Sequence, residues 1–176
     1  MAASPTQPWT PEPNSCYPDA AADSYEEGSQ MRGRCLCGAV SFEAEIKGRG
    51  LYQCHCSLCR RQSGAASNAA TVIPLASFRW LSGEELITKW AKRTGFRSHF
   101  CSTCGSPVPN QVQQAELMWI PAGLLEGADD MRVVAHMQVS SAAGWDPRPE
   151  NGLIYEEDPD PAEISAALFH GPSTPT

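Results

Sequence analysis

The sequence lacks any apolar run long enough to cross a membrane. Its longest apolar stretch, Leu117–Leu125, is interrupted by Pro121 and Gly123, and it is about half of the ~20 residues that a transmembrane helix needs. Residues 1–30 contain no Lys or Arg and no long apolar segment, so they lack the features of a secretory or mitochondrial leader. We therefore expect a cytoplasmic protein without a membrane partner.

Basic residues are absent from one end of the chain and scarce at the other. The 176 residues include 13 Lys or Arg and 20 Asp or Glu, a formal net charge of −7. Residues 1–30 carry five acids and five prolines, and residues 146–176 carry seven acids, six prolines and one base, Arg148. Such acidic, proline-rich segments are usually poorly ordered. The folded part is therefore expected in the mildly basic centre, which has no long basic stretch typical of a nucleic-acid partner.

Long amphipathic helices and internal repeats are also missing. Instead, apolar residues alternate with polar ones from Val40 to Ile46, as in a half-buried strand. Further strand-like runs separated by turn residues follow at 70–73, 78–81, 86–91, 96–100, 117–122 and 132–139. About seven short strands predict an all-β domain.

Two short helical segments are expected within this all-β pattern. Ser57–Gly64 can form one helical turn after the central cysteines. Near the C-terminus, Asp160 is a capping residue, Pro161 suits the first helical position, and Glu163 lies three residues after the cap. The apolar residues of that segment share one face: Ile164, Ala167 and Leu168. We therefore predict a short C-terminal helix over 161–169, ended by Gly171.

Seven of the eight cysteines fall in three clusters. These are Cys35-x-Cys37, Cys54-x-Cys56-x-x-Cys59 and Cys101-x-x-Cys104, and Cys16 stands alone. Disulfides require an oxidising compartment, for which the sequence carries no signal. Closely spaced thiols in an intracellular chain favour tetrahedral zinc. Cys16 is interpreted as an exposed free thiol.

The outer two clusters are predicted to form one closed structural zinc site. Residues i and i+2 of an extended chain point to the same side, so Cys35 and Cys37 can aim two sulfurs at one ion. Gly38 and Gly105 follow a cysteine of each cluster and let the backbone turn tightly past a ligand. The predicted ligands are Cys35, Cys37, Cys101 and Cys104.

The central cluster then offers three cysteine ligands to a metal and no fourth. Three protein ligands and one open position are typical of a catalytic zinc site, so Cys54, Cys56 and Cys59 are the predicted catalytic ligands. The open position suits water or a substrate thiolate. Three thiolates leave the zinc site with one negative charge, which Arg60 and Arg61 are placed to offset.

A histidine that completes the central site is the alternative. His55 is poorly placed for ligation, because in an extended segment its side chain faces away from the neighbouring sulfurs. We expect it to support the ligands indirectly. His99 and His136 lie in strand-like runs and are interpreted as ordinary sheet residues, and His170 as solvated.

These motifs together resemble a known family. Gly33-x-Cys35-x-Cys37-Gly38, Cys54-His55-Cys56-x-x-Cys59-Arg60 and Phe100-Cys101-x-x-Cys104-Gly105-Ser106 are similar to the glutathione-dependent formaldehyde-activating (GFA) family, which includes centromere protein V. His136 and Trp145 resemble that family's last strand and closing tryptophan. The resemblance covers roughly residues 31–158, between an acidic tail over 1–30 and a C-terminal extension over 159–176.

The resemblance implies a small β-tent-like domain with two zinc ions and a carbon–sulfur lyase activity. It assigns structural zinc to the four outer cysteines and catalytic zinc to the central three, as the spacing does. The implied reaction joins glutathione to formaldehyde and gives S-hydroxymethylglutathione. Glutathione has two carboxylates, so Arg60, Arg61 and Arg97 are the expected docking charges.

Three alternatives stay open at this point. Thiols add to formaldehyde unaided, so the substrate of such a site can be a larger glutathione adduct. The domain can instead be a zinc-stabilised interaction module without catalysis. The exposed thiolates can also serve in redox sensing. The oligomeric state is not predicted.

Overall fold

The computed structural model describes residues 28–113 and 115–170. Within them the chain forms eleven strands and two α-helices. The strands are β1 (Ser29–Arg34), β2 (Ser41–Ile46), β3 (Gly50–Cys54), β4 (Asn68–Pro74), β5 (Phe78–Ser82), β6 (Ile87–Ala91), β7 (Arg97–Cys101), β8 (Asn110–Gln111), β9 (Leu117–Pro121), β10 (Arg132–Met137) and β11 (Leu153–Ile154). The helices are α1 (Ser57–Ser63) and α2 (Pro161–His170). The all-β fold class is confirmed.

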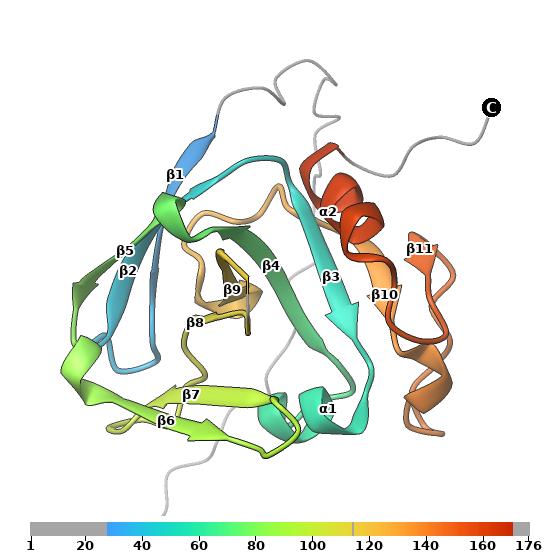
Figure 1. The fold of residues 1–176 in the computed structure, drawn as a ribbon, viewed down its shortest axis with the longest axis horizontal. Helices are drawn as coiled ribbons and strands as arrows, with labels where there is room; N and C mark the ends of the chain where they lie inside the picture. The colour runs from blue at the N-terminus through green and yellow to red at the C-terminus, as the bar shows by residue number, and fades with distance from the viewer. Residues whose placement is uncertain (1–27, 114, 171–176) are drawn as a thin grey trace, which may run out of the picture.

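Three sheets make up the domain. One has the strand order β1-β2-β5, a second β11-β10-β3-β4-β9-β8, and β6 pairs with β7 as a hairpin. All neighbours are antiparallel except β10, which runs parallel to both β3 and β11. Figure 1 shows the sheets as the sides of a triangle, with α1 at one corner beside the β6–β7 hairpin.

The main core lies between the three-stranded and the six-stranded sheets. The alternation in β2 places Phe42 and Ala44 on its buried face, both fully buried. They pack with Ile73 of β4 and Ile120 of β9. Because neighbouring residues of a strand point to opposite faces, the polar residues between them lie on the outer face. The two-residue period seen in the sequence is therefore confirmed.

The C-terminal helix covers the opposite face of the large sheet. Asp160 caps α2 as predicted, because its Oδ1 accepts a hydrogen bond of 2.8 Å from the amide of Ala162. Ala167 and Leu168 of α2 are buried against β10 residues. A Cβ atom at Gly50 would lie only 2.6 Å from the Leu168 Cα, so the helix rests directly on the start of β3. Figure 1 shows α2 lying alongside β3 and β10.

Several sequence expectations concern residues outside this description. Cys16, Gly171 and most of the acidic tail lie outside the described residues. The division into a tail, a domain over 31–158 and an extension stays a prediction, and β1 begins within the segment assigned to the tail, at Ser29. Neither of the two described α-helices has the length and apolar character of a membrane span.

Candidate metal centres and the adjoining pocket

The four outer cysteines come together at the junction of two sheets. Cys35 and Cys37 follow β1, whereas Cys101 ends β7 and Cys104 lies in the loop after it. Their sulfurs all lie within 4.8 Å of one another. Cys35 and Cys101 are almost completely buried and pack with Val40. This cluster therefore connects the three-stranded sheet to the β6–β7 hairpin.

The spacing of these sulfurs fits a tetrahedral metal. A zinc ion with Zn–S bonds of about 2.3 Å separates its four sulfurs by roughly 3.8 Å. The Sγ atoms of Cys35 and Cys37 lie 3.5 Å apart, and those of Cys37 and Cys101 lie 3.9 Å apart. The four-sulfur donor set thus has both the chemistry and the dimensions of a structural zinc site.

Two glycine turns bring the cysteines into place. Gly38 and Gly105 have φ angles of 77° and 76°, in the left-handed region that favours glycine. The Gly38 amide donates to the Cys35 carbonyl at 2.9 Å, and the Gly105 amide donates to the Cys101 carbonyl at 2.8 Å. Each turn folds the chain back beside its pair of sulfurs, as the two glycines predicted. The expectation of an extended segment from Cys35 to Cys37 is wrong, because these residues form a hydrogen-bonded turn.

Two thiols of this cluster differ in how readily they ionise. The Ser106 side chain, which lies 3.5 Å from the Cys104 sulfur, lowers the pKa of the Cys104 thiol to about 5. Although a backbone hydrogen bond from Ala39 opposes the effect, the neighbouring Cys35 raises the pKa of Cys37 to about 11. Thiolates this close repel one another, and a bound cation would offset that repulsion.

The central three cysteines lie at the junction of β3 and α1. Cys54 ends β3, Cys56 is the N-cap of α1, and Cys59 lies in its first turn. The Cys56 sulfur accepts a hydrogen bond of 3.4 Å from the Cys59 amide. The ligand atoms of the three residues lie within 4.8 Å of one another, and the cluster has no fourth His, Cys, Asp or Glu among the described residues.

One thiolate is favoured within this cluster. A hydrogen bond from Cys59 lowers the pKa of Cys54 to about 6, and the same bond raises the pKa of Cys59 well above its usual range. Burial also raises the pKa of Cys59. Three thiol sulfurs within 4.8 Å of one another fit a soft metal such as zinc.

His55 supports the loop between the ligands, as expected. Its ring Nδ1 lies 2.9 Å from Asp146 Oδ2, and its Nε2 lies 3.1 Å from Nδ1 of His136. The backbone amide of His55 donates to the Met137 carbonyl at 2.9 Å. The ring is buried in these contacts, so it faces away from the sulfurs and holds the segment between Cys54 and Cys56 against β10.

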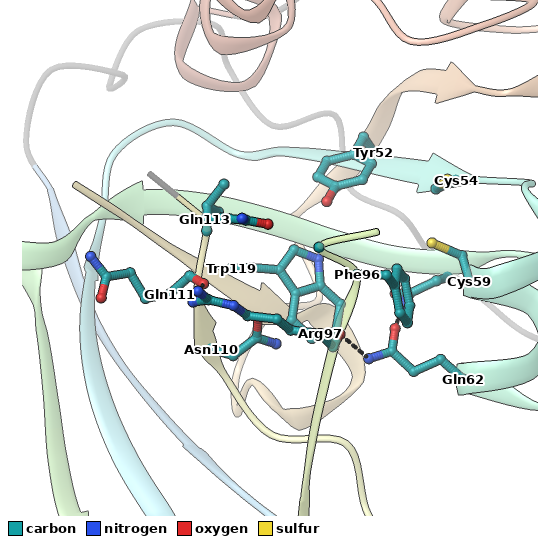
Figure 2. Close-up of a pocket in the computed structure, with 13 residues that line it drawn as sticks. Tyr52, Cys54, Cys59, Gln62, Phe96, Arg97, Asn110, Gln111, Gln113 and Trp119 are labelled. Carbon is teal, nitrogen blue, oxygen red and sulfur yellow. Dashed lines mark hydrogen bonds between the residues drawn. The ribbon is translucent and has the colours of Figure 1, made fainter. Parts of the chain in front are cut away.

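A pocket of about 320 Å³ adjoins the three-cysteine cluster. Cys54 and Cys59 form part of its wall, and Figure 2 shows the Cys59 sulfur and the Tyr52 hydroxyl pointing toward it. The other lining residues come from several elements: Tyr52, Gln62, Asn68, Gly95, Phe96, Arg97, Asn110, Gln111, Val112, Gln113 and Trp119. The volume lies at the lower end of the range for small-molecule sites, about 300–1,000 Å³.

Tyr52 is a pocket residue that the sequence reasoning did not identify. It lies two residues before Cys54 in β3, and this spacing, which places both side chains on one face of a strand, was the signal available. Burial raises the pKa of the Tyr52 hydroxyl above its usual range. The hydroxyl therefore stays protonated at neutral pH and can donate a hydrogen bond into the pocket.

Gln62 fixes the distance between α1 and the neighbouring strands. Its Oε1 accepts a hydrogen bond of 2.9 Å from Asn68 of β4, and its Nε2 lies 3.3 Å from Ser98 Oγ of β7. The dashed line in Figure 2 marks a further bond from Gln62 to the Arg97 carbonyl, at 3.5 Å. These bonds hold the helix that carries Cys59 against both walls of the pocket.

The three arginines expected to dock a substrate occupy different positions. Arg97 lines the pocket and donates to the Gln111 carbonyl at 3.3 Å. Arg60 donates to the carbonyls of His55 and Ser141, both at 3.2 Å. Arg61 lines an adjoining groove beside α1. Of these three arginines, only Arg97 is part of the pocket wall, and the docking role of all three stays a prediction.

The chain is similar to known proteins. The family model described as glutathione-dependent formaldehyde-activating enzyme matches residues 30–141, more than half of the chain. A crystal structure of a Rhodobacter sphaeroides protein is 26% identical in sequence, with a TM-score of 0.49, and the match covers 71% of this chain and 99% of that one. The search of curated proteins gave no match. The chain therefore belongs to the glutathione-dependent formaldehyde-activating enzyme family.

Proposed function

We propose that the chain is a zinc-dependent carbon–sulfur lyase that forms and cleaves adducts of glutathione with formaldehyde. The observation that carries the proposal is a three-sulfur metal cluster in the wall of a small-molecule pocket. A cluster with three protein ligands leaves one position for a substrate atom. Membership of the family supports glutathione and formaldehyde as the reactants.

The proposal assigns different roles to the two cysteine clusters. Cys35, Cys37, Cys101 and Cys104 hold a structural zinc, because four sulfurs fill a tetrahedral site. Cys54, Cys56 and Cys59 hold the catalytic zinc beside the pocket. A zinc ion there supplies Lewis acidity, which lowers the pKa of a nearby thiol from its usual value of about 8.5 toward neutral pH. The expected content is two zinc ions per chain.

The reaction needs a donor for the oxygen of the aldehyde. When the glutathione sulfur attacks, its lone pair forms the C–S bond and the C=O π electrons move to oxygen, which finally takes the thiol proton. Tyr52 carries a protonated hydroxyl that points into the pocket. It is placed to donate a hydrogen bond to the developing oxyanion, an interaction that strengthens in the transition state.

The proposal is tested by exchange NMR of glutathione and formaldehyde with the zinc-loaded protein. Wild-type protein should accelerate formation and breakdown of S-hydroxymethylglutathione over the uncatalysed rate. Cys56→Ser should reduce this acceleration about 100-fold or more, because it removes a catalytic metal ligand. Cys16→Ser is the matched control, since it also replaces one thiol but lies outside the three cysteine motifs of the sequence.

Two results would contradict the proposal. Exchange at the wild-type rate in Cys56→Ser would show that the three-cysteine cluster is not catalytic. Tight binding of a macromolecule by a wild-type protein that accelerates no adduct exchange would instead support the interaction module.

A second candidate substrate is a larger glutathione adduct. The structural reason is a groove of about 440 Å³ that shares Gln62 and Phe96 with the pocket. Its walls are mainly apolar and include Leu58, Trp90 and Phe100. Trp90 is 51% exposed, an unusual exposure for so large an apolar side chain. Formaldehyde has no group that would use this groove.

An aldehyde series distinguishes the two substrates. Exchange rates for glutathione adducts of formaldehyde and of an aromatic aldehyde are compared in wild type and Trp90→Ala. Use of the groove predicts that Trp90→Ala slows only the aromatic adduct, by about tenfold for roughly 1–2 kcal/mol of lost contact. Equal effects on both aldehydes would exclude this role of the groove.

A further inference from the structure

The basic residues of the domain are unevenly paired. Six ion pairs are found in the described residues. Their bases are Arg32, Arg34, Arg49, His55, Arg79 and Arg148. Residues 86–115, which contain the β6–β7 hairpin, carry four bases and no Asp or Glu. These bases are Lys89, Lys92, Arg93 and Arg97, and none of them takes part in those ion pairs. The hairpin thus carries positive charge that nothing in the described part of the chain neutralises by direct contact.

Three of these bases surround a second cavity at the tip of the hairpin. This cavity has a volume of about 310 Å³, and Lys92, Arg93 and Arg97 form its basic wall. It shares Gly95, Arg97 and Gln113 with the pocket beside the three-cysteine cluster. A single small molecule can therefore place one group near the sulfurs and another near these cations.

The turn that presents the cations has a defined conformation. The Lys92 amide donates to the Phe96 carbonyl at 2.8 Å, and the Gly95 amide donates to the Lys92 carbonyl at 2.9 Å. Gly95 has a φ angle of 98°, and a Cβ atom there would lie 2.2 Å from Gln113 Oε1. Glycine therefore lets the turn close against Gln113. The turn that carries Lys92 and Arg93 therefore lies against a residue of the pocket wall.

We infer that Lys92 and Arg93, together with Arg97, form a carboxylate-binding subsite that selects carboxylated thiols as substrates. The identity of the thiol rests on the proposed function, since glutathione carries one carboxylate at each end of the molecule. Guanidinium groups bind carboxylates through paired charge-assisted hydrogen bonds, and lysine adds a point charge. The shared wall at Arg97 lets the same molecule reach the three-cysteine cluster.

Binding of S-methylglutathione to the full, zinc-loaded chain tests this inference. Its sulfur is blocked, whereas both carboxylates remain. We expect measurable binding by calorimetry, with amide NMR shifts at residues 92–97. The double variant Lys92→Gln/Arg93→Gln should weaken this binding about tenfold or more, as loss of two charge-assisted contacts implies. The diethyl ester of S-methylglutathione, which lacks both negative charges, should bind wild type and the double variant equally weakly.

A second double variant controls for net charge. Arg34→Gln/Lys47→Gln also replaces one arginine and one lysine, and both positions lie outside the lining of this cavity. It should leave the affinity for S-methylglutathione unchanged. Equal affinities of wild type and Lys92→Gln/Arg93→Gln, or equally tight binding of the ester, would overturn the inference.

The binding test of the subsite and the exchange test of the proposed lyase can fail independently. Binding that depends on Lys92 and Arg93 in a protein that accelerates no adduct exchange would support the subsite and refute the lyase. Adduct exchange with a wild-type affinity for S-methylglutathione in the double variant would support the lyase and refute the subsite.

Discussion

Individual cysteines differ in what surrounds them, and this decides what their loss should do. Cys101 is fully buried and packs with Val40 and Val108 beside the three other sulfurs of its cluster. Cys56 is only half-buried and lies at the start of a short helix. A metal held at the first cluster joins two sheets, whereas a metal at the second joins β3 to one turn of helix.

Cys101→Ser should therefore unfold the domain, and Cys56→Ser should leave it folded. Structural zinc contributes on the order of 10 kcal/mol to folding, which is comparable with the whole stability of a typical domain, about 5–15 kcal/mol. Circular dichroism during thermal unfolding gives the melting temperature of each variant. Equal melting temperatures of Cys101→Ser and wild type would refute the structural role of the four-cysteine cluster.

Tyr52 gives a second prediction at the scale of one residue. Tyr52→Phe keeps the ring and removes the hydroxyl, so loss of an oxyanion donor should slow adduct exchange about 100-fold. Zinc content and melting temperature should not change. Tyr155→Phe, which alters a tyrosine packed against α2, is the matched control. A wild-type exchange rate in Tyr52→Phe would remove the hydroxyl from the mechanism.

At the scale of elements, short segments around the three-cysteine cluster are held by polar contacts with distant strands. Asp146 binds His55 from a loop beyond β10, and Gln62 links α1 to β4 and β7. None of these contacts could be read from the spacing of the cysteines, because each joins separate elements of the fold. Spacing predicted the candidate ligands, and only the fold shows what holds them in position.

Asp146→Ala should loosen the segment between Cys54 and Cys56. We expect the zinc affinity of the central cluster to fall about 10–100-fold, the usual effect of removing a group that orients a metal-binding segment. Titration with a chelator should show one weakened zinc and one unchanged zinc. Two unchanged affinities would mean that the His55 contacts do not position the ligands.

The helix α2 has a structural role that is also testable. Leu168→Ala should lower the free energy of unfolding by about 2–5 kcal/mol, the range for removing a buried leucine side chain. Chemical denaturation measures the loss. His170→Ala, an exposed position of the same helix, should change stability little, and an equal effect of both variants would contradict the packing of α2 on β3 and β10.

The alternation of β2 could be predicted from the sequence, whereas β1, β3, β8 and β11 lie outside the predicted runs. β2 alternates buried and partly exposed residues along its whole length, and its sequence shows this period. In β3, partly exposed residues occupy three consecutive positions between buried ends, because the strand is central in the sheet and borders the pocket. β8 and β11 have only two residues each, which is too short for any period.

In the whole molecule, bases without an ion pair in the described residues gather at the tip of the β6–β7 hairpin. Three of them, Lys92, Arg93 and Arg97, line the cavity there. The sequence indicated a basic centre, but only the fold shows that Lys92 and Arg93 gather at one cavity and that Arg60 binds backbone carbonyls instead.

Metal removal should proceed in two steps. The central cluster has three sulfurs and borders an open pocket, so a strong chelator should remove its metal first and abolish activity while the fold persists. The second metal should leave only as the domain unfolds, because its loss and unfolding are coupled. Zinc release and circular dichroism, followed together, show whether the first metal leaves before the domain unfolds. Unfolding before any loss of activity would contradict this order.

The central claim is that the three-cysteine cluster holds a metal with one position open to a substrate thiol. Cadmium NMR of the cadmium-substituted protein tests it most directly. Two resonances are expected. One of them moves toward the position of an all-sulfur site when glutathione is added, and it stays in place with S-methylglutathione. A single resonance, or two resonances that glutathione leaves unmoved, would contradict it.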